Sequence, residues 1–442
     1  MLECWTENPF SGLRPSPTPG RGGAPASSVR NSGMKLNIVS EYDPLEAVLV
    51  HRPGAEIDRL THENMTRFLF EDIPYLARMQ EEHDAFVATM RERNIEVLYL
   101  EALLGEMLAD HPQTKRALIE EVCTAERVPA IAPDLLDERL FPDEALMRVL
   151  FAGLTDEEYY EITSRRLHIS PEQRSFLIAP IPNAYFSRDP AVTVGQSVIS
   201  CKMHHIERVR ETILTRAVLE HHPEFAGHEI AYGGSESPTE DRPFTIEGGD
   251  VIVLNEEAVL VGVSQRTRSE TICVLASKAF ETGKVRRFYE IPIPTERTFM
   301  HLDTVFTLVD RAMVVWYPGV MEHIEYIQQL KPDGAGGVIR EADSRSLVQI
   351  LNDEFGQEVR IVRTGGGDRH FADREQRTDG TNTLAIAPRL ACTYERNSRT
   401  IAAMEEAGVT CIPIVGSELV RGLGGPRCMT MPLRRTPRSD GA

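Results

Sequence analysis

A chain of 442 residues in which 41% of the side chains are apolar can form one large domain or two or three ordinary ones. Its net charge of −19 would repel the phosphates of nucleic acids and of anionic lipids, so we expect neither as a partner. No apolar run reaches the ~20 residues that cross a bilayer, and residues 1–33 lack the apolar core of a secretory signal. We therefore expect no membrane insertion and no secretion.

The cysteines favour a reducing compartment. They are scattered and odd in number, and no two of them form a Cys-x-x-Cys pair. Because a disulfide framework would need paired cysteines, we expect a cytoplasmic protein.

The two ends of the chain differ from its middle. Residues 1–33 are rich in Pro, Gly, Ser and Arg without helical or strand periodicity, which predicts a disordered N-terminal extension. Regular patterns begin at Met34 and predict a single catalytic domain over 34–435. Residues 436–442 are predicted to form a loose C-terminal tail.

Within this domain one unit recurs: a polar residue, a strand, a short turn, a second strand and an amphipathic helix. Such repetition predicts α/β units that pack against one another in a closed or stacked array. The opening polar residues of four copies are Asp189, Asp250, Asp303 and Asn382, and Asp43 opens a looser fifth copy. The helices are predicted from about residues 207, 269 and 398, and over about 322–330 and 76–93.

If the array closes, the opening polar residues meet at its axis and line one central cavity. The alternative is that each of them only starts a strand through ordinary turn chemistry. That alternative explains any single copy more easily than it explains all of them.

The stretch over about 101–171 departs from the repeat. Its apolar residues recur at spacings of three and four, which is typical of amphipathic helices. We predict an inserted helical module with no catalytic group.

Cys428 lies in the segment GGPRCMTMP, residues 424–432. The glycines let a bound group come close to the backbone, and the preceding arginine favours the thiolate, which is the nucleophilic form of cysteine. By itself this segment fits a buried structural cysteine equally well.

A cavity that collects Asp189, Glu247, Asp250 and Asp303 must hold a cation, because buried carboxylates are costly unless they are paired. With His301 and Cys428 among the acids, a zinc site stays open. A guanidinium ion fits better, since its planar donors match carboxylates and its carbon accepts attack by a thiolate.

Six motifs then resemble one family. In order and spacing they are similar to the arginine deiminases of the guanidine-modifying, or pentein, superfamily, over about residues 35–435. This resemblance implies a five-bladed α/β propeller, and the helical insert is a deiminase feature within the superfamily. The motifs are FEDIPYL (70–76), PNAYFSRDP (182–190), IEGGDV (246–251), MHLDTVFT (300–307), REQRTDGTNTLAIAP (374–388) and GGPRCMTMPL (424–433).

The resemblance implies a hydrolase that acts on a carbon–nitrogen bond of a linear amidine, converting L-arginine to L-citrulline and ammonia without a metal or organic cofactor. Cys428 matches the nucleophile that forms a covalent S-alkylthiouronium intermediate. His301 matches the group that protonates the departing amine and later deprotonates water.

The carboxylates divide into three roles by the same resemblance. Asp189 and Asp303 match the residues that hold the guanidinium nitrogens, Glu247 matches the one that orients the histidine, and Asp250 supports the site. We expect these anions to raise the pKa of Cys428 in the empty site and a bound guanidinium to lower it, so that thiolate formation is substrate-assisted.

Four further residues match substrate-binding positions. Arg208 and Arg266 match arginines that hold the substrate carboxylate, Asn183 matches an amide at the α-amino end, and Phe186 matches an aromatic ring on the aliphatic stem. We expect the two arginines to have no acidic partner of their own. The alternative is that they form surface salt bridges with Glu207, Glu211 and Glu270.

Two other functions stay open. One is a related activity on agmatine, methylated arginine or an amidino acceptor, against which Arg208, Arg266 and the insert argue. The other is a non-catalytic homologue that binds arginine. Leu423 stands where some family members have an arginine that influences loop gating and product release. We expect a homo-oligomer.

Overall fold

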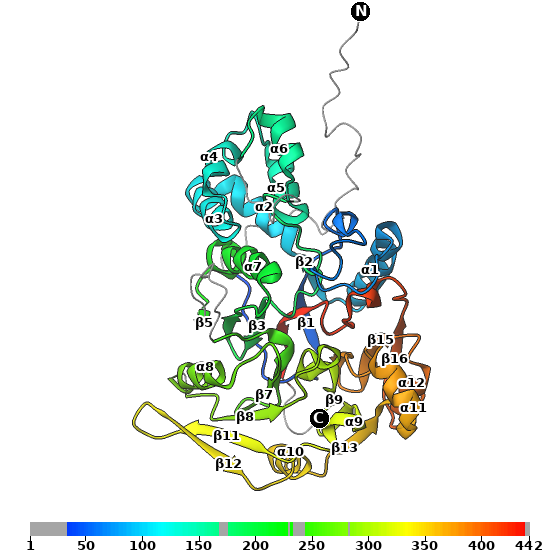
Figure 1. The fold of residues 1–442 in the computed structure, drawn as a ribbon. Helices are drawn as coiled ribbons and strands as arrows, with labels where there is room; N and C mark the ends of the chain where they lie inside the picture. The colour runs from blue at the N-terminus through cyan, green and yellow to red at the C-terminus, as the bar shows by residue number, and fades with distance from the viewer. Residues whose placement is uncertain (1–32, 168–175, 229, 233–243, 282, 438–442) are drawn as a thin grey trace, which may run out of the picture.

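The computed structural model describes residues 33–167, 176–228, 230–232, 244–281 and 283–437. Its strands form five separate sheets, four of three strands and one of five, and the helices pack around them (Figure 1). No sheet among these residues closes into a barrel. The mixed α/β class that the sequence predicts is confirmed.

Every sheet contains the same motif. Two strands pair antiparallel, a helical segment follows, and a third strand pairs in parallel with the second. The sequence predicted the first two strands of four units and one strand of the fifth, but not the parallel third strand of any. In chain order the motifs are β3 (Ala191–Val194), β4 (Ser197–Ser200), α7 (Val209–His221) and β5 (Ile230–Tyr232); β6 (Val251–Val253), β7 (Ala258–Val263), α8 (Ser269–Glu281) and β8 (Arg287–Pro292); β9 (Phe306–Asp310), β10 (Met313–Trp316), α10 (Leu347–Phe355) and β13 (Arg360–Arg363); and β14 (Leu384–Ala387), β15 (Leu390–Tyr394), α12 (Ser398–Glu406) and β16 (Thr410–Ile414).

The fifth motif joins the two ends of the described chain. Strand β1 (Leu45–Val50) pairs in parallel with β2 (Glu96–Tyr99), which follows α1 (Leu76–Arg91). On its other edge β1 pairs antiparallel with β17 (Met431–Arg435). The segment just before β17, which carries Cys428, is thereby fixed beside the first strand.

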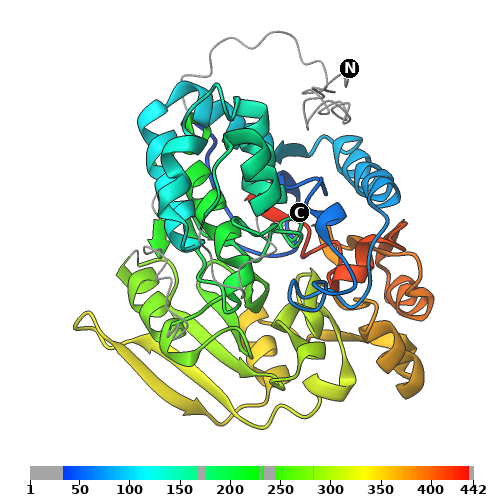
Figure 2. The same ribbon diagram turned by 45° about the horizontal axis from the view of Figure 1, so that its top comes forward.

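One predicted helix is wrong. Residues 322–330 were expected to be helical, but α9 (Pro318–Met321) ends before them and β11 (Ile327–Pro332) begins within them. The reason is tertiary pairing: Leu330 lies opposite Phe288 of β8 and is fully buried, so the segment gains more as a strand. β11 and β12 (Val338–Asp343) form a long hairpin that extends away from the rest of the molecule (Figure 2).

Five helices form the insert and gather on α7 (Figures 1 and 2). Their apolar faces, with residues such as Ile119 and Val149, share one core cluster with Ile213 and Leu214 of α7. The spacing of three and four in the sequence is the spacing of these buried faces. The helices are α2 (Leu100–Asp110), α3 (Pro112–Ala125), α4 (Ala132–Leu135), α5 (Asp143–Ala152) and α6 (Asp156–Thr163).

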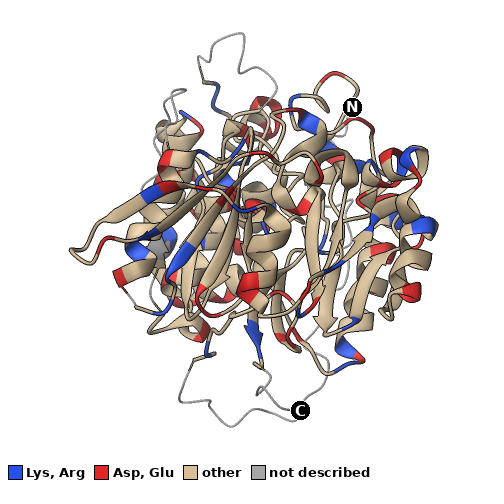
Figure 3. Ribbon diagram, turned by 90° about the horizontal axis from the view of Figure 1, so that it is seen from below, with Lys and Arg blue, Asp and Glu red and all other residues tan. Residues whose placement is uncertain are grey.

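None of the helices in the described ranges is long and apolar enough to cross a bilayer. Lysines and arginines are interspersed with acidic residues over the side drawn in Figure 3. The predicted disordered extension lies outside the described residues except for Gly33, and so does most of the predicted tail. At the start of that tail, the N–H of Thr436 donates to the Pro44 carbonyl at 3.0 Å.

Candidate active site

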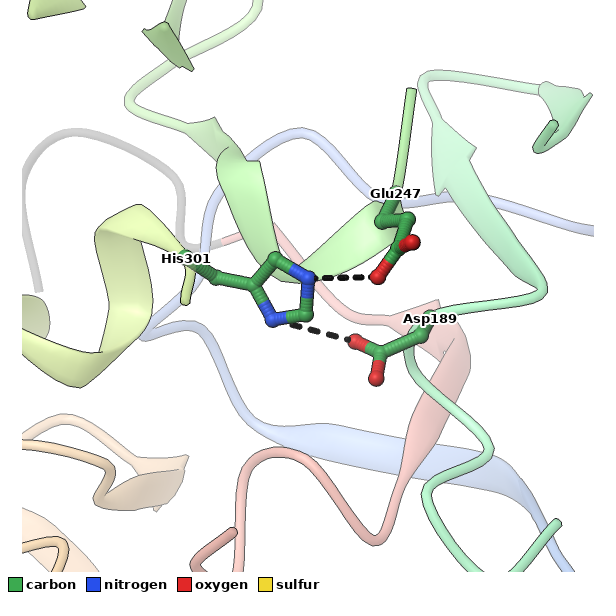
Figure 4. Close-up of side chains that lie close together, drawn as sticks. All are labelled: Asp189, Glu247 and His301. Carbon is green, nitrogen blue, oxygen red and sulfur yellow. Dashed lines mark hydrogen bonds and ion pairs between the residues drawn. The ribbon is translucent and has the colours of Figure 1, made fainter. Parts of the chain in front are cut away.

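His301 lies between two carboxylates (Figure 4). Its Nε2 is 2.7 Å from Glu247 Oε2, and its Nδ1 is 3.6 Å from Asp189 Oδ1. Each of these buried residues stands shortly before the first strand of a unit, β9, β6 and β3, which is how residues far apart in sequence meet. Gly249 permits this approach, because a Cβ there would lie 2.5 Å from His301 Nδ1.

These carboxylates decide the charge of the imidazole. Burial alone would lower the pKa of His301, but Asp189, the hydrogen bond to Glu247 and the charge of Asp250 outweigh it and raise the pKa to about 9. Burial would raise the pKa of Glu247, yet Arg266 and His301 hold it well below its usual range. At neutral pH the pair is therefore an imidazolium and a carboxylate, with a proton available for donation.

The side chain of Asn382 hydrogen-bonds to both the thiol and the backbone of Cys428. Asn382 Nδ2 donates to Sγ at 3.1 Å, and Asn382 Oδ1 accepts from the Cys428 N–H at 3.0 Å. The thiol donates to Asp303 Oδ2 at 3.5 Å. The sequence placed Asn382 among the opening polar residues but gave it no contact with the thiol.

The surroundings of Cys428 oppose the thiolate. Burial, and then Asp303, Asp189 and Asp379, raise its pKa well above the ordinary value, and Arg427 opposes them less strongly. The predicted direction is confirmed, although burial was not part of that prediction. Arg427 favours the thiolate, as its place before Cys428 indicates, but burial and the aspartates outweigh it.

Two carboxylates also bind Arg427. Its Nη1 donates to Asp303 Oδ2 at 2.7 Å, and its Nη2 donates to Glu41 Oε1 at 3.1 Å. Burial would raise the pKa of Glu41, but Arg427, Arg188 and Arg435 bring it to about 2. No sequence motif pointed to Glu41, whose partner lies at the opposite end of the chain.

Some buried aspartate oxygens at this site accept no hydrogen bond. Asp189 Oδ1, which forms an ion pair with His301 Nδ1 at 3.6 Å, and Asp303 Oδ1 have no donor at hydrogen-bond distance, whereas their Oδ2 atoms accept from Arg208 at 2.8 Å and from Arg427 at 2.7 Å. A buried acceptor without a donor costs free energy, so both oxygens favour a ligand that brings N–H groups.

Arg208 and Arg266 each have an acidic partner, so the expectation that they have none is wrong. The alternative named Glu211 correctly for Arg208, but both arginines are buried and not on the surface. Arg208 Nη1 donates to Asp189 and its Nη2 donates to Glu211 Oε2 at 2.7 Å, while Arg266 Nη1 donates to Glu247 Oε2 at 3.1 Å. Buried carboxylates without a ligand need such counter-charges.

Asn183 and Phe186 are both buried, and Phe186 contacts the Cys428 loop, defined as residues 415–430 between β16 and β17. Asn183 Nδ2 already donates to the Phe68 carbonyl at 2.8 Å. The Phe186 ring packs directly on Gly424, where any Cβ would collide with it.

Asp250 supports the segment around His301. Its Oδ1 accepts from the Leu302 N–H at 2.8 Å, and its Oδ2 accepts from the Ser264 hydroxyl at 2.7 Å. Burial raises the pKa of Asp250 to about 6, against the opposing charge of His301. Both of its oxygens are thus used within the protein.

By spacing alone, Asp189, Glu247 and His301 could hold a metal ion, since one ligand atom from each lies within 4.8 Å of the others. The chemistry of the cluster fits poorly, because Arg208 and Arg266 already supply positive charge to its carboxylates. His301 is also protonated at neutral pH and would have to lose that proton before it bound a metal.

Solved structures share this fold. One is SxtG, an amidinotransferase from Microseira wollei, with a TM-score of 0.54 and 14% identity over 91% of this chain and 98% of that chain. Another is the N-terminal domain of ArgZ, a cyanobacterial arginine dihydrolase, with a TM-score of 0.50 and 13% identity over 89% and 98% of the two chains. At such identities the likeness establishes the fold only.

The fold, together with the sequence matches below, places the chain among the guanidine-modifying, or pentein, proteins. Within that class it belongs to the arginine deiminase family, whose model matches residues 66–435. Arginine deiminase of Listeria monocytogenes is 40% identical over 407 residues, which cover 90% of this chain and 98% of that protein. Arginine deiminase of Clostridium perfringens is 38% identical over 411 residues, with the same coverage.

Proposed function

We propose that the protein hydrolyses L-arginine to L-citrulline and ammonia, and that the buried site around Cys428 and His301 carries the reaction. The observation that best supports this site is that one oxygen of Asp189 and one oxygen of Asp303 are buried and accept no hydrogen bond. A guanidinium group supplies planar N–H donors and a positive charge together, which both oxygens can use.

Cys428 is the proposed nucleophile. A bound guanidinium counters the carboxylates that raise the pKa of the thiol, so binding favours the thiolate, and the thiol proton passes to solvent. The thiolate forms a bond to the guanidinium carbon, and the imidazolium of His301 gives its proton to one amino group. Ammonia then leaves, and an S-alkylthiouronium cation remains on Cys428.

The second half of the reaction uses His301 as a base. Neutral imidazole takes a proton from water, and the resulting hydroxide forms a bond to the same carbon. The carbon–sulfur bond then breaks and the hydroxyl on that carbon gives its proton to solvent, which releases L-citrulline and restores the thiolate. Glu247, 2.7 Å from Nε2, orients the ring and stabilises its charged form in both halves.

The substrate's other groups are assigned to the residues around this centre. We propose that Arg208 and Arg266 bind the substrate carboxylate, that Phe186 packs on the aliphatic stem, and that Asn183 binds at the α-amino end. Without substrate, Arg208 pairs with Asp189 and Arg266 pairs with Glu247. Binding of the substrate carboxylate must therefore replace these ion pairs with new ones to the two arginines. Asp250 keeps its supporting position.

Several broader expectations belong to the same proposal. The five sheets are proposed to be the blades of a pentein propeller, supported by the shared motif and by the pairing of β1 with β17. We propose one catalytic domain over 34–435 with the helical insert at about 101–171. We also propose a cytoplasmic homo-oligomer that needs no metal or organic cofactor and does not bind nucleic acid.

The experiment that tests the substrate is a citrulline assay with L-arginine, agmatine and dimethylarginine side by side. We expect a ureido product from L-arginine and much less from the other two, since agmatine lacks the carboxylate that Arg208 and Arg266 would bind. A preference for agmatine or dimethylarginine would transfer the proposal to another guanidine-modifying activity.

A further inference from the structure

The Cys428 loop is anchored to α1 by one buried carboxylate, that of Glu82. Glu82 is 2% exposed and accepts four hydrogen bonds from the start of the loop. Its Oε1 accepts from the Ser417 N–H at 3.1 Å and from the Ser417 hydroxyl at 2.6 Å. Its Oε2 accepts from the N–H groups of Glu418 and Leu419 at 2.9 and 3.1 Å.

These N–H groups need an acceptor from elsewhere in the protein. They stand at the beginning of a 3₁₀ turn, Leu419–Gly422, where the turn itself offers them no carbonyl. A carboxylate is a strong acceptor for backbone N–H groups. The conformation of this part of the loop therefore depends on a residue that is far away in sequence.

The middle of the loop packs on the residues proposed to line the substrate site. The Leu419 carbonyl accepts from the Tyr185 hydroxyl at 3.0 Å, and the rings of Tyr185 and Phe186 lie 4.0 Å apart. A Cβ on Gly422 would collide with the Tyr185 hydroxyl, and a Cβ on Gly424 would collide with the Phe186 ring. A small displacement of the loop would therefore move the Phe186 ring.

The end of the loop is fixed by another residue. Asn382 holds Cys428 through Sγ and N–H at 3.1 and 3.0 Å, and this contact does not involve α1. The start and the end of the loop thus have separate anchors.

We infer that Glu82 is a positioning residue for substrate binding, which sets the middle of the Cys428 loop against Phe186 without placing the nucleophile. The inference rests on the proposed function for its kinetic consequences. Its structural content, the dependence of the loop on Glu82, holds whatever the substrate is.

The test compares Glu82→Gln with Glu81→Gln. A glutamine at 82 must point its amide N–H₂ at some of the backbone N–H groups, so donors face donors. We expect KM for L-arginine to rise about tenfold, while kcat changes by less than about threefold. Glu81 is an exposed neighbour on the same helix whose partner among the described residues is Arg78, so Glu81→Gln should keep both constants.

Hydrogen exchange gives a readout that does not need turnover. In Glu82→Gln the amides of residues 417–419 should exchange about tenfold faster, while those of β17 keep their wild-type rates. If wild type makes no citrulline, the proposed function fails, but this measurement still decides the role of Glu82.

For Glu82→Gln, unchanged hydrogen exchange at residues 417–419 would overturn the inference. So would an unchanged KM, whether kcat stays the same or falls. Ser417→Ala removes one of the four donors and keeps the backbone bonds. It should raise KM by less than Glu82→Gln does, and it provides the test if that variant fails to fold.

Discussion

The side-chain amide of Asn382 brackets Cys428, donating to Sγ at 3.1 Å and accepting from the N–H of the same residue at 3.0 Å. One residue thereby fixes the position of the sulfur and also gives it a hydrogen-bond donor. A thiolate gains more from that donor than a thiol does, because a bond to a charged acceptor is the stronger one. The contact favours the reactive form in a site whose burial and carboxylates disfavour it.

Replacing Asn382 should therefore reduce the chemical step. We expect Asn382→Ala to lower kcat for L-arginine by about a hundredfold, since it removes the donor and frees the nucleophile. Steady-state kinetics with citrulline detection measure this. A wild-type kcat in the variant would show that the amide does not act on the thiol.

The pH dependence of thiol alkylation reports how the thiolate forms. In the empty enzyme, iodoacetamide should label Cys428 slowly until strongly alkaline pH, because burial and three aspartates raise its pKa. A non-reactive guanidinium compound should move the labelling profile to lower pH. Identical profiles with and without the compound would contradict substrate-assisted ionisation.

Arg208 should determine the preference for a substrate with a carboxylate. Arg208→Met removes the proposed partner of that carboxylate, so the ratio of kcat/KM for L-arginine over agmatine should fall about a hundredfold. Parallel assays on both substrates give the ratio. An unchanged ratio would leave Arg208 only as the counter-charge of Asp189 and Glu211.

His51 predicts a pH dependence of stability, because it ties the end of β1 to the insert. Its Nδ1 lies 2.8 Å from Glu101 Oε2 and its Nε2 lies 3.0 Å from Glu56 Oε1, while its ring stacks on Phe151. Burial would lower the pKa of His51, but Glu101 and Glu56 raise it to about 10. The folded-state pKa is thus above the usual value of 6.5.

A raised pKa stabilises the fold at low pH. The contribution of His51 to the free energy of unfolding should be complete below about pH 6.5 and should disappear as pH rises through about 10. Urea titrations at several pH values should show wild type losing more stability over this range than His51→Gln. His62→Gln, at an exposed histidine, is the control and should follow wild type.

Local sequence patterns predicted much of the fold. Helices α8 and α12 begin where their apolar periodicity predicted, at Ser269 and Ser398, because periodicity and the residues before it are local signals. The segment at 322–330 was assigned wrongly because its structure depends on Phe288 of another strand. The parallel strands, such as β13 and β16, are short and charged or exposed in places, so they carried no clear pattern.

In the candidate site, too, local motifs were predictable from the sequence and contacts between distant segments were not. Cys428, His301 and the carboxylates were identifiable because their motifs resemble a known family, and the structure brings Asp189, Glu247 and His301 together. The pairing of Arg427 with Glu41 was not predictable, because it depends on the joining of the two ends of the chain. Glu82 gave no signal, since on α1 it resembles any other helical glutamate.

The most direct test of the account is the stoichiometry of L-arginine turnover by wild type and by Cys428→Ser. The account predicts that wild type releases L-citrulline and ammonia in equal amounts and that Cys428→Ser, which keeps the site's shape, releases neither above background. Turnover of L-arginine by Cys428→Ser at the wild-type rate, or no citrulline from wild type, would contradict it.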